Sequence, residues 1–407
     1  MSSPRYNSHQ IIVLLICVGI FALGQFHRAS GGVFTPILMD RFALSAATIG
    51  GLVSAMFFAT ILAQVPFGVA LDKKGPRPVL SLCILIIAVG TAIFAFADSF
   101  DAMFLSRVLI GIGSAAMGAA THLIIARNFT GSDFGYISGL VVTLGGIGGL
   151  IGTYPLAFVL ERVSWSVVFA TVAATTLLLS VVVFGSVRRG APETVESDPD
   201  VGKQGFLTLL SRPEFLRILV LGAVTYAPIT TITGLWGGPY LQDVTGLSAE
   251  QAGAVLLLFF SATIVAGYVF GLLDRRAKSR KRIVLVAVGL SGFMLILLAG
   301  LNGLSAQTSI ALLLAMVFLQ QFYVPLGAHM RRAVPDRMLG RASTLLSLVS
   351  VAAIPAMQLG FGGVLDLAAS MGFGIEAQYR LAFGLMGILI LLCGSVYAFA
   401  QDADDFE

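Results

Sequence analysis

The sequence predicts an all-α membrane protein with twelve transmembrane helices, arranged as two pseudo-symmetric bundles of six. Hydrophobic residues make up 57% of the chain and charged residues only 11%, whereas soluble domains carry roughly 25% charged residues. A span needs about 20 apolar residues, so a chain of 407 residues holds twelve spans and short loops. A charged loop in the first half also has a counterpart in the second half, as expected of a repeated architecture.

The predicted spans are apolar runs separated by short polar segments. Glycine and proline occur inside several of them, as transmembrane helices tolerate, and Pro228, Pro239, Pro325 and Pro355 are candidate kinks. The first run is predicted to be retained as a span, because it lacks the short core and small-residue cleavage site of a signal peptide. The spans are 11–37, 46–71, 78–97, 103–126, 135–160, 166–187, 215–240, 249–273, 283–302, 308–329, 341–365 and 380–400.

One long polar stretch, 188–213, divides the spans six and six. It is charged and rich in proline and glycine, which is typical of a flexible linker. The predicted organisation is therefore an N-terminal six-helix bundle (1–187), a cytoplasmic linker (188–213), a C-terminal six-helix bundle (214–400) and an acidic tail (401–407).

The distribution of lysine and arginine predicts the orientation. With the N-terminus in the cytoplasm, only Arg41, Arg162 and Arg380 lie on the outer side, and Arg28 and Arg107 lie within spans. The other basic residues then all fall on the cytoplasmic side, as the positive-inside rule requires. We therefore expect a multi-pass protein of the cytoplasmic (inner) membrane with both termini inside. The net charge of +4 reflects this topology rather than a nucleic-acid partner.

The loop after the second span carries a recognisable motif. It reads Gly68-x-x-x-Asp72-Lys73-x-Gly75-x-Arg77 and resembles the signature loop of the major facilitator superfamily. The resemblance covers the six-plus-six organisation and the central linker, and it implies the fold of that superfamily and transport by alternating access. The loop after the eighth span is a weaker second copy, with Gly271, Asp274 and Arg275.

The resemblance implies that this loop controls gating by packing span 2 near span 11. Gly68 would allow close backbone approach, and Asp72 could lie at the positive N-terminal end of a neighbouring helix. The alternative is that Lys73, Lys74 and Arg77 only anchor the helix ends at the membrane surface.

Two further motifs are rich in glycine. Span 4 carries Arg107-x-x-x-Gly111-x-Gly113, similar to a second motif of the superfamily. Span 5 has a glycine run followed by Tyr154-Pro155, similar to the Gly-Pro motif of drug antiporters but without the Gly-Pro pair. We expect these glycines to serve close helix packing.

The charges within the spans indicate the sign of the substrate. All 21 acidic residues fall in loops or at span ends, whereas Arg28 and Arg107 lie within spans 1 and 4. A charge at membrane depth is costly and usually functional, and arginine matches carboxylate, phosphate or sulfonate groups. The sequence therefore predicts an anionic substrate. For Arg107, extension towards the outer headgroups is the alternative.

These two arginines also weakly resemble the organic-anion (anion:cation symporter) branch of the superfamily. That branch has acidic residues where this chain has His27 and Ser114, so the resemblance keeps the anion-binding arginines and loses both carboxylates. His27 is then the candidate for proton coupling. Anion exchange and facilitated transport without protons are the alternatives.

Uncharged polar and aromatic residues in spans 7 and 10 are the remaining candidate substrate contacts. They suit a substrate with a hydroxylated or apolar body, although Trp236 could instead belong to the interfacial aromatic belt. They are Tyr226, Thr230, Trp236, Gln320, Gln321 and Tyr323.

The predicted function is secondary active transport of a small organic anion by alternating access; the alternative is efflux of a drug or metabolite. An enzyme is not expected, because four histidines and no acid within the spans leave no catalytic set. We expect no cofactor and no metal. The expected partners are a small-molecule substrate, a coupling proton or counter-anion, and the lipid bilayer, with the protein acting as a monomer.

Overall fold

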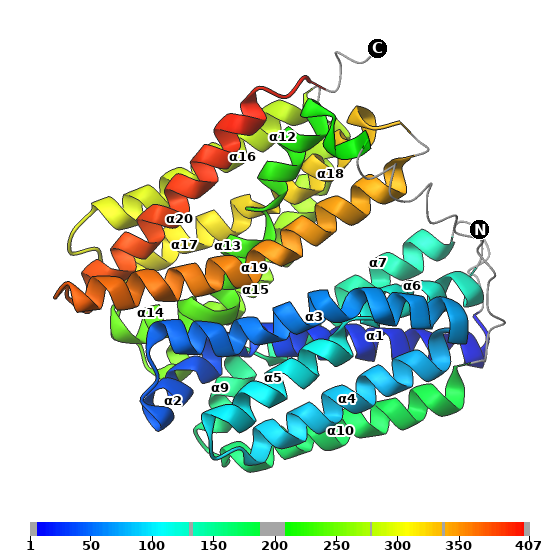
Figure 1. The fold of residues 1–407 in the computed structure, drawn as a ribbon. Coiled ribbons are helices and arrows are strands. Elements are labelled where there is room, and N and C mark those ends of the chain that lie inside the picture. Colours follow the sequence, from blue (N-terminus) through cyan, green and yellow to red (C-terminus); the bar gives the residue numbers. More distant parts are fainter. Residues whose placement is uncertain (1–5, 130–132, 188–207, 277–278, 336–337, 403–407) are drawn as a thin grey trace. The chain divides into compact units, whose positions relative to one another are not determined.

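Twelve helical segments in the computed structural model are long and apolar enough to cross a membrane. The structure describes residues 6–129, 133–187, 208–276, 279–335 and 338–402, and no strand occurs among them (Figure 1). The prediction of an all-α protein with twelve spans is confirmed. Most of the predicted linker, residues 188–207, and the end of the predicted tail, 403–407, lie outside the described residues.

The first compact unit comprises residues 1–31 and 55–195. In it, α4 packs along α10 and α5, while α1 packs against α7 and α8. Its helices are α1 (Ser8–Ala29), α4 (Pro76–Phe96), α5 (Phe100–Ser114), α6 (Met117–Asn128), α7 (Asp133–Gly145), α8 (Ile147–Ile151), α9 (Tyr154–Leu160) and α10 (Trp165–Ser186).

The second compact unit comprises residues 32–54 and 196–407. In it, α16 packs along α20 and α17, and α13 packs against α19. Its helices are α2 (Gly31–Phe42), α12 (Pro213–Gly222), α13 (Tyr226–Thr231), the π-helical η1 (Ile232–Trp236), α14 (Gly237–Asp243), α15 (Ala249–Arg276), α16 (Arg280–Gly300), α17 (Ala306–Leu319), the 3-10 segment η2 (Gln320–Phe322), α18 (Tyr323–Ala333), α19 (Leu339–Ser370) and α20 (Ile375–Ala398).

One helix runs through both units. The long helix α3 (Ala46–Lys74) begins in the second unit and passes into the first at Ala55. Residues 32–54 come from the first half of the chain, yet they pack with the second half.

Local sequence explains where several helices begin. Asn7 and Gln10 form a capping box at the start of α1, with each side chain accepting a backbone N–H. This arrangement satisfies donors that the first turn of a helix leaves open. Between α3 and α4, Gly75 takes a φ of 75°, which L-residues rarely adopt, and Pro76 opens α4. Gly75 of the predicted signature loop is therefore explained by its backbone conformation, which glycine adopts without strain.

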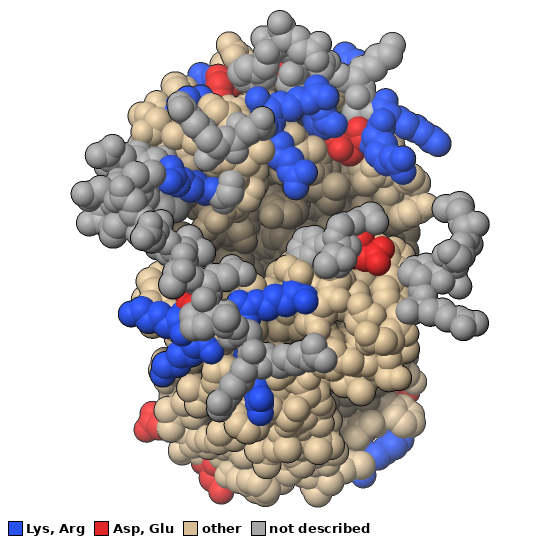
Figure 2. Space-filling model, turned by 90° about the vertical axis from the view of Figure 1, so that its right-hand side faces the viewer, with Lys and Arg blue, Asp and Glu red and all other residues tan. Residues whose placement is uncertain are grey.

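Basic side chains gather at one end of the helices in each unit, on the face that Figure 2 shows. They lie at the ends of α3 (Lys73, Lys74) and α6 (Arg127) in the first unit, and of α15 (Arg275, Arg276) and α18 (Arg331, Arg332) in the second. This concentration is the distribution from which the sequence predicts the cytoplasmic side.

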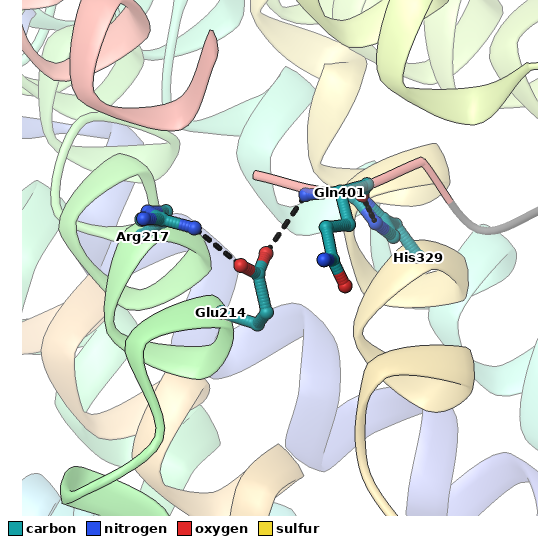
Figure 3. A network of polar contacts seen from close by, with 4 residues as sticks. All are labelled: Glu214, Arg217, His329 and Gln401. Carbon is teal, nitrogen blue, oxygen red and sulfur yellow. Dashed lines mark hydrogen bonds and ion pairs between the residues drawn. The ribbon is translucent and has the colours of Figure 1, made fainter. Parts of the chain in front are cut away.

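At the same end of the second unit, the chain after α20 is tied to two other helices (Figure 3). The Gln401 N–H donates to Glu214 at 2.8 Å, and Glu214 also pairs with Arg217. The Gln401 carbonyl lies 3.0 Å from Nε2 of His329. The first residue of the predicted acidic tail thus joins the start of α12 to the end of α18.

The glycine run of span 5 gives the first prediction. A Cβ on Gly148 would lie 1.9 Å from the Ala22 carbonyl oxygen of α1, whereas a Cβ on Gly139 would meet nothing within 4 Å. Gly148→Ala should therefore force α1 and α8 apart and lower the free energy of unfolding by about 1–3 kcal/mol. Thermal unfolding of the detergent-solubilised protein measures the loss. Gly139→Ala is the matched control, and equal stability of the two variants would contradict this packing.

Candidate functional site

Five of the predicted spans are interrupted: span 5, which is divided into α7, α8 and α9, and spans 1, 4, 7 and 10. Span 1 is interrupted at Ser30 between α1 and α2, and span 4 between α5 and α6. Span 7 is interrupted between α12 and α13, and span 10 at η2. Short 3-10 stretches within a helix often mark hinges. Interrupted helices at corresponding positions of two repeats point to the binding site of a transporter.

Span 7 is interrupted because of a proline. Pro228 has no N–H, so the carbonyl of Val224 loses its partner one turn earlier. The turn before it tightens, with the N–H groups of Val224 and Thr225 donating three residues back to Leu221 and Gly222. The candidate kink at Pro228 is therefore confirmed as a real interruption of the helix.

The Val224 carbonyl is satisfied from span 10. Gln320 is fully buried, and its Nε2 donates to this carbonyl at 3.1 Å. From span 11, Ser350 donates to the Gly222 carbonyl at 2.9 Å. Gln320 itself belongs to the 3-10 segment that interrupts span 10. One side chain thus links the interruption of span 7 to that of span 10. This contact favours a positioning role for Gln320 over the substrate contact expected from the sequence.

Two tyrosines follow these interruptions directly. Tyr226 is the first residue of α13 and Tyr323 the first of α18, and their ring centres lie 5.1 Å apart in an edge-on arrangement. Tyr226 is 40% exposed, and Tyr323 is half-buried. Thr230 donates its hydroxyl to the Tyr226 carbonyl, and both Thr230 and Gln321 are half-buried. The structure thus brings Tyr226 and Tyr323 together with accessible surface.

Trp236 lies in the interior of the second unit. Its side chain has no exposed surface, its Nε1 donates to the Gln358 carbonyl at 3.1 Å, and its ring stacks on Phe361. It ends the π-helical segment η1, which precedes Pro239. This burial favours a packing role for Trp236 over both the substrate contact and the interfacial belt considered from the sequence.

In the first unit, the two candidates on span 1 face different surroundings. Arg28 is exposed, two residues before the interruption at Ser30, whereas His27 is buried. The Nε2 atom of His27 lies 3.4 Å from the hydroxyl of Thr91 on α4. Adjacent residues on a helix point about 100° apart, so Arg28 alone presents its charge to accessible space.

Arg107 is enclosed within the first unit. It is 1% exposed, and its guanidinium carbon lies 4.3 Å from the ring centre of Phe94. Trp165 donates to the Phe94 carbonyl at 2.9 Å and packs on its ring, which fixes this aromatic face. A cation over an aromatic ring is stabilised by the ring quadrupole. The predicted alternative, extension of Arg107 to the headgroups, is wrong, because the side chain is buried.

Ser114 is the last residue of α5, where span 4 is interrupted. Its hydroxyl donates to the Ile110 carbonyl at 2.7 Å, and the side chain is half-buried. The glycines of the Arg107 motif pack closely: a Cβ on Gly111 would lie 2.2 Å from the Met56 carbonyl oxygen, and one on Gly113 would lie 2.4 Å from that of Cys83. The expected packing role of these glycines is confirmed.

The two signature loops differ. Asp72 and Lys73 are exposed, whereas Arg77 places its guanidinium carbon 4.5 Å from the ring centre of Phe184. In the second loop Asp274 accepts from Arg280 at 2.7 Å, and Arg275 is exposed. A Cβ on Gly68 or on Gly271 would meet nothing within 4 Å in this structure, and the gating role expected of the first loop stays a prediction.

The sequence analysis missed three residues that organise the site: Phe94, Ser350 and Gln358. Phe94 and Ser350 lie on spans 3 and 11, which carry no buried charge to attract attention. Proline gives no signal for these three residues, because the carbonyl that Pro228 frees is that of Val224, whereas Ser350 donates to the Gly222 carbonyl and the Gln358 carbonyl accepts from Trp236. No group of three or more histidine, cysteine or acidic residues that could hold a metal occurs among the described residues.

Comparison with known proteins gives the wider context. The family model described as Major Facilitator Superfamily matches residues 14–356. A hexuronate transporter of Bacillus subtilis is 22% identical over 324 residues, covering 76% of each chain. A probable L-galactonate transporter of Escherichia coli is 27% identical over 179 residues, covering 44% of this chain and 40% of the relative. The crystal structure of the nucleoside transporter NupG matches with a TM-score of 0.78 at 13% identity, covering 96% of this chain and 99% of NupG.

The adjacent glutamines of span 10 give the second prediction. Gln320→Leu removes the donor to the Val224 carbonyl and leaves that group buried without a partner. The free energy of unfolding should fall by about 1–3 kcal/mol, as measured by thermal unfolding in detergent. Gln321→Leu, one residue along and half-buried, is the control and should leave stability nearly unchanged. A Gln320→Leu protein as stable as the wild type would refute the stabilising role of the Gln320–Val224 hydrogen bond.

Proposed function

We propose that this chain, which belongs to the Major Facilitator Superfamily, is a secondary transporter that carries a small organic anion across the cytoplasmic membrane. Transport proceeds by alternating access, with both chain termini in the cytoplasm. The observation that carries the proposal is a fixed positive charge, Arg28, beside the interruption of span 1. The substrate class is a carboxylate or a chemically similar anion.

The charges of the described spans support an anion. Every acidic side chain that belongs to a described helix lies within the first or last five residues of that helix. Arg28 and Arg107 therefore add positive charge to spans 1 and 4, which carry no acidic residue in the middle of a described helix. Interactions between charges are strong in such low-dielectric surroundings. An anion would be attracted and a cation repelled.

The two arginines take different roles in this proposal. Arg28 is exposed, so its guanidinium can donate to a substrate carboxylate in the two-pronged manner that arginine allows. Arg107 is buried against Phe94 and acts through its charge rather than by contact. His27 lies beside Arg28 on span 1, and Ser114 lies seven residues after Arg107 on span 4.

The second unit offers uncharged groups next to its own interruptions. Tyr226 and Tyr323 present aromatic faces with phenolic groups, and Thr230 and Gln321 add polar side chains. Such groups are suited to a hydroxylated substrate body, because they hydrogen-bond hydroxyls without adding charge. The relatives named as a hexuronate transporter and a probable L-galactonate transporter take their names from hydroxylated carboxylates, which supports the same class for this chain.

Three coupling mechanisms are compatible with this proposal: proton symport through His27, anion exchange, and facilitated transport without coupling. They are separated by uptake of a hexuronate, such as D-glucuronate, into proteoliposomes with and without an imposed pH gradient. Uptake that ignores the gradient removes His27 from the coupling mechanism. Dependence on a trapped internal anion identifies exchange.

Substitution of Arg28 tests the anion site, and this is the third prediction. Arg28→Gln keeps a polar side chain and removes the charge, so uptake of D-glucuronate should fall about 10- to 100-fold, the usual range for a lost charge-assisted hydrogen bond. Initial rates in proteoliposomes measure the effect. Arg28→Lys should recover part of the rate, because the charge returns without the planar fork.

Arg162→Gln is the matched control, since Arg162 is exposed in the loop between α9 and α10 of the same unit. It should transport at the wild-type rate. Undiminished uptake by Arg28→Gln would refute the anion site. Efflux of an uncharged drug or metabolite by that variant would favour the alternative function.

A further inference from the structure

The first nine residues of α3 run antiparallel to the last part of α19 within the second unit. Contacts recur one helical turn apart along both helices, at positions 46, 50 and 54 of α3 and at 358, 362 and 366 of α19. Residues four apart lie on one face of a helix. The pairing is therefore a continuous seam, which we call the α3–α19 seam.

A carboxylate closes the seam at the helix end. The two oxygens of Asp366 accept the N–H groups of Ala46 and Ala47, at 2.9 and 2.8 Å. The next N–H, that of Thr48, donates to the Ser45 side chain, and the N–H of Ile49 donates to the Ser45 carbonyl. All four open donors of the first turn are thus satisfied, two of them by a helix from the other half of the chain.

Close packing continues from this cap. A Cβ on Gly362 would lie 2.5 Å from the Ala46 carbonyl oxygen, and a Cβ on Gly50 would lie 3.2 Å from that of Gln358. At the inner end of the seam, the Ser54 hydroxyl lies 3.3 Å from Oε1 of Gln358. Two glycines, the Asp366 cap and the Ser54 contact thus join the two helices along this face, with the Trp236 ring packed beside Gly50 and Gly362.

Chain connectivity gives the seam a role beyond static packing. Beyond Ser54, α3 continues into the first unit. A transporter that works by alternating access rocks one repeat against the other, so contacts between segments from the two halves of the chain must break and re-form. We propose that the α3–α19 seam is a gate at the end of α3 opposite its basic loop, and that Asp366 is the latch of this gate.

The two carboxylates near opposite ends of α3 agree with this role. Asp72, in the signature loop, is exposed, whereas Asp366 is bonded to the helix N-terminus. Latches at opposite ends of one helix should not both be closed while a substrate passes. Water at the helix end can also replace Asp366 when the gate opens, so the latch breaks at modest cost. This inference requires only that the chain is an alternating-access transporter, and it does not depend on the charge of the substrate.

Asp366→Asn tests the latch. The amide is nearly the same size as the carboxylate, but it loses the charge and one acceptor. Spin labels on cysteines at Ala43, in the exposed turn before α3, and at Ser370, the exposed last residue of α19, report the gate by pulsed electron paramagnetic resonance. Cys17, Cys83 and Cys393 are first replaced by alanine. No ligand is needed for the measurement.

Glu376→Gln is the matched control, because Glu376 is exposed near the start of α20 and its loss removes the same charge. The ratio of long to short label distances should rise about five- to ten-fold in Asp366→Asn, as for a lost helix cap, and should stay at the wild-type value in Glu376→Gln. Equal distributions in all three proteins would overturn the latch, as would equal shifts in both variants.

Gly362→Ala provides an independent arm if Asp366→Asn fails to fold. Its added methyl group pushes against the Ala46 carbonyl and should raise the same ratio while the carboxylate stays in place. An unchanged ratio in a folded Gly362→Ala protein would overturn the seam as a gate. Because no substrate is used, either failure leaves the proposed anion specificity untouched.

Discussion

The rest of the structure depends on one constraint: a backbone carbonyl within the bilayer must find a donor inside the protein. Lipid offers none, and each unsatisfied group costs several kcal/mol. Pro228 leaves such a carbonyl at Val224, and the Gln320 side chain of span 10 donates a hydrogen bond to it. A helix interrupted in mid-membrane therefore needs another donor for the freed carbonyl, and in span 7 a neighbouring helix supplies it. Spans 7 and 10 are consequently fixed to one another at the depth where both are interrupted.

The same interruptions place chemistry at membrane depth. Arg28 precedes one, Ser114 ends a helix at another, and Tyr226 and Tyr323 begin helices after two more. The first unit carries the two arginines, and the second carries aromatic and hydroxyl groups beside its own interruptions. Phe94 and Trp165 hold Arg107 inside the first unit, so its charge is present without being offered to solvent. Arg107 is buried, whereas Arg28 is exposed, so Arg28 is the arginine that can contact an anion in this account.

Sequence patterns predicted the parts of the fold that depend on composition and spacing. The twelve spans, the packing glycines near Arg107 and the kink at Pro228 all follow from local rules on apolar length, small residues and proline. The interior of each unit was harder to predict. Gln320 and Trp236 look like substrate contacts by residue type, but tertiary neighbours bury both and use their polar atoms. Phe94 gave no signal, because one aromatic residue in an apolar span resembles any other until Arg107 is placed beside it.

The central claim is that this transporter recognises the negative charge of its substrate. Isothermal titration of the purified protein with D-glucuronate and with D-glucuronamide, its uncharged amide, tests that claim most directly, since the two ligands have nearly the same shape. Our account predicts that the carboxylate binds about 10- to 100-fold more tightly, the difference expected for one charge-assisted contact to arginine. Equal affinity for the two ligands, or tighter binding of the amide, would contradict it.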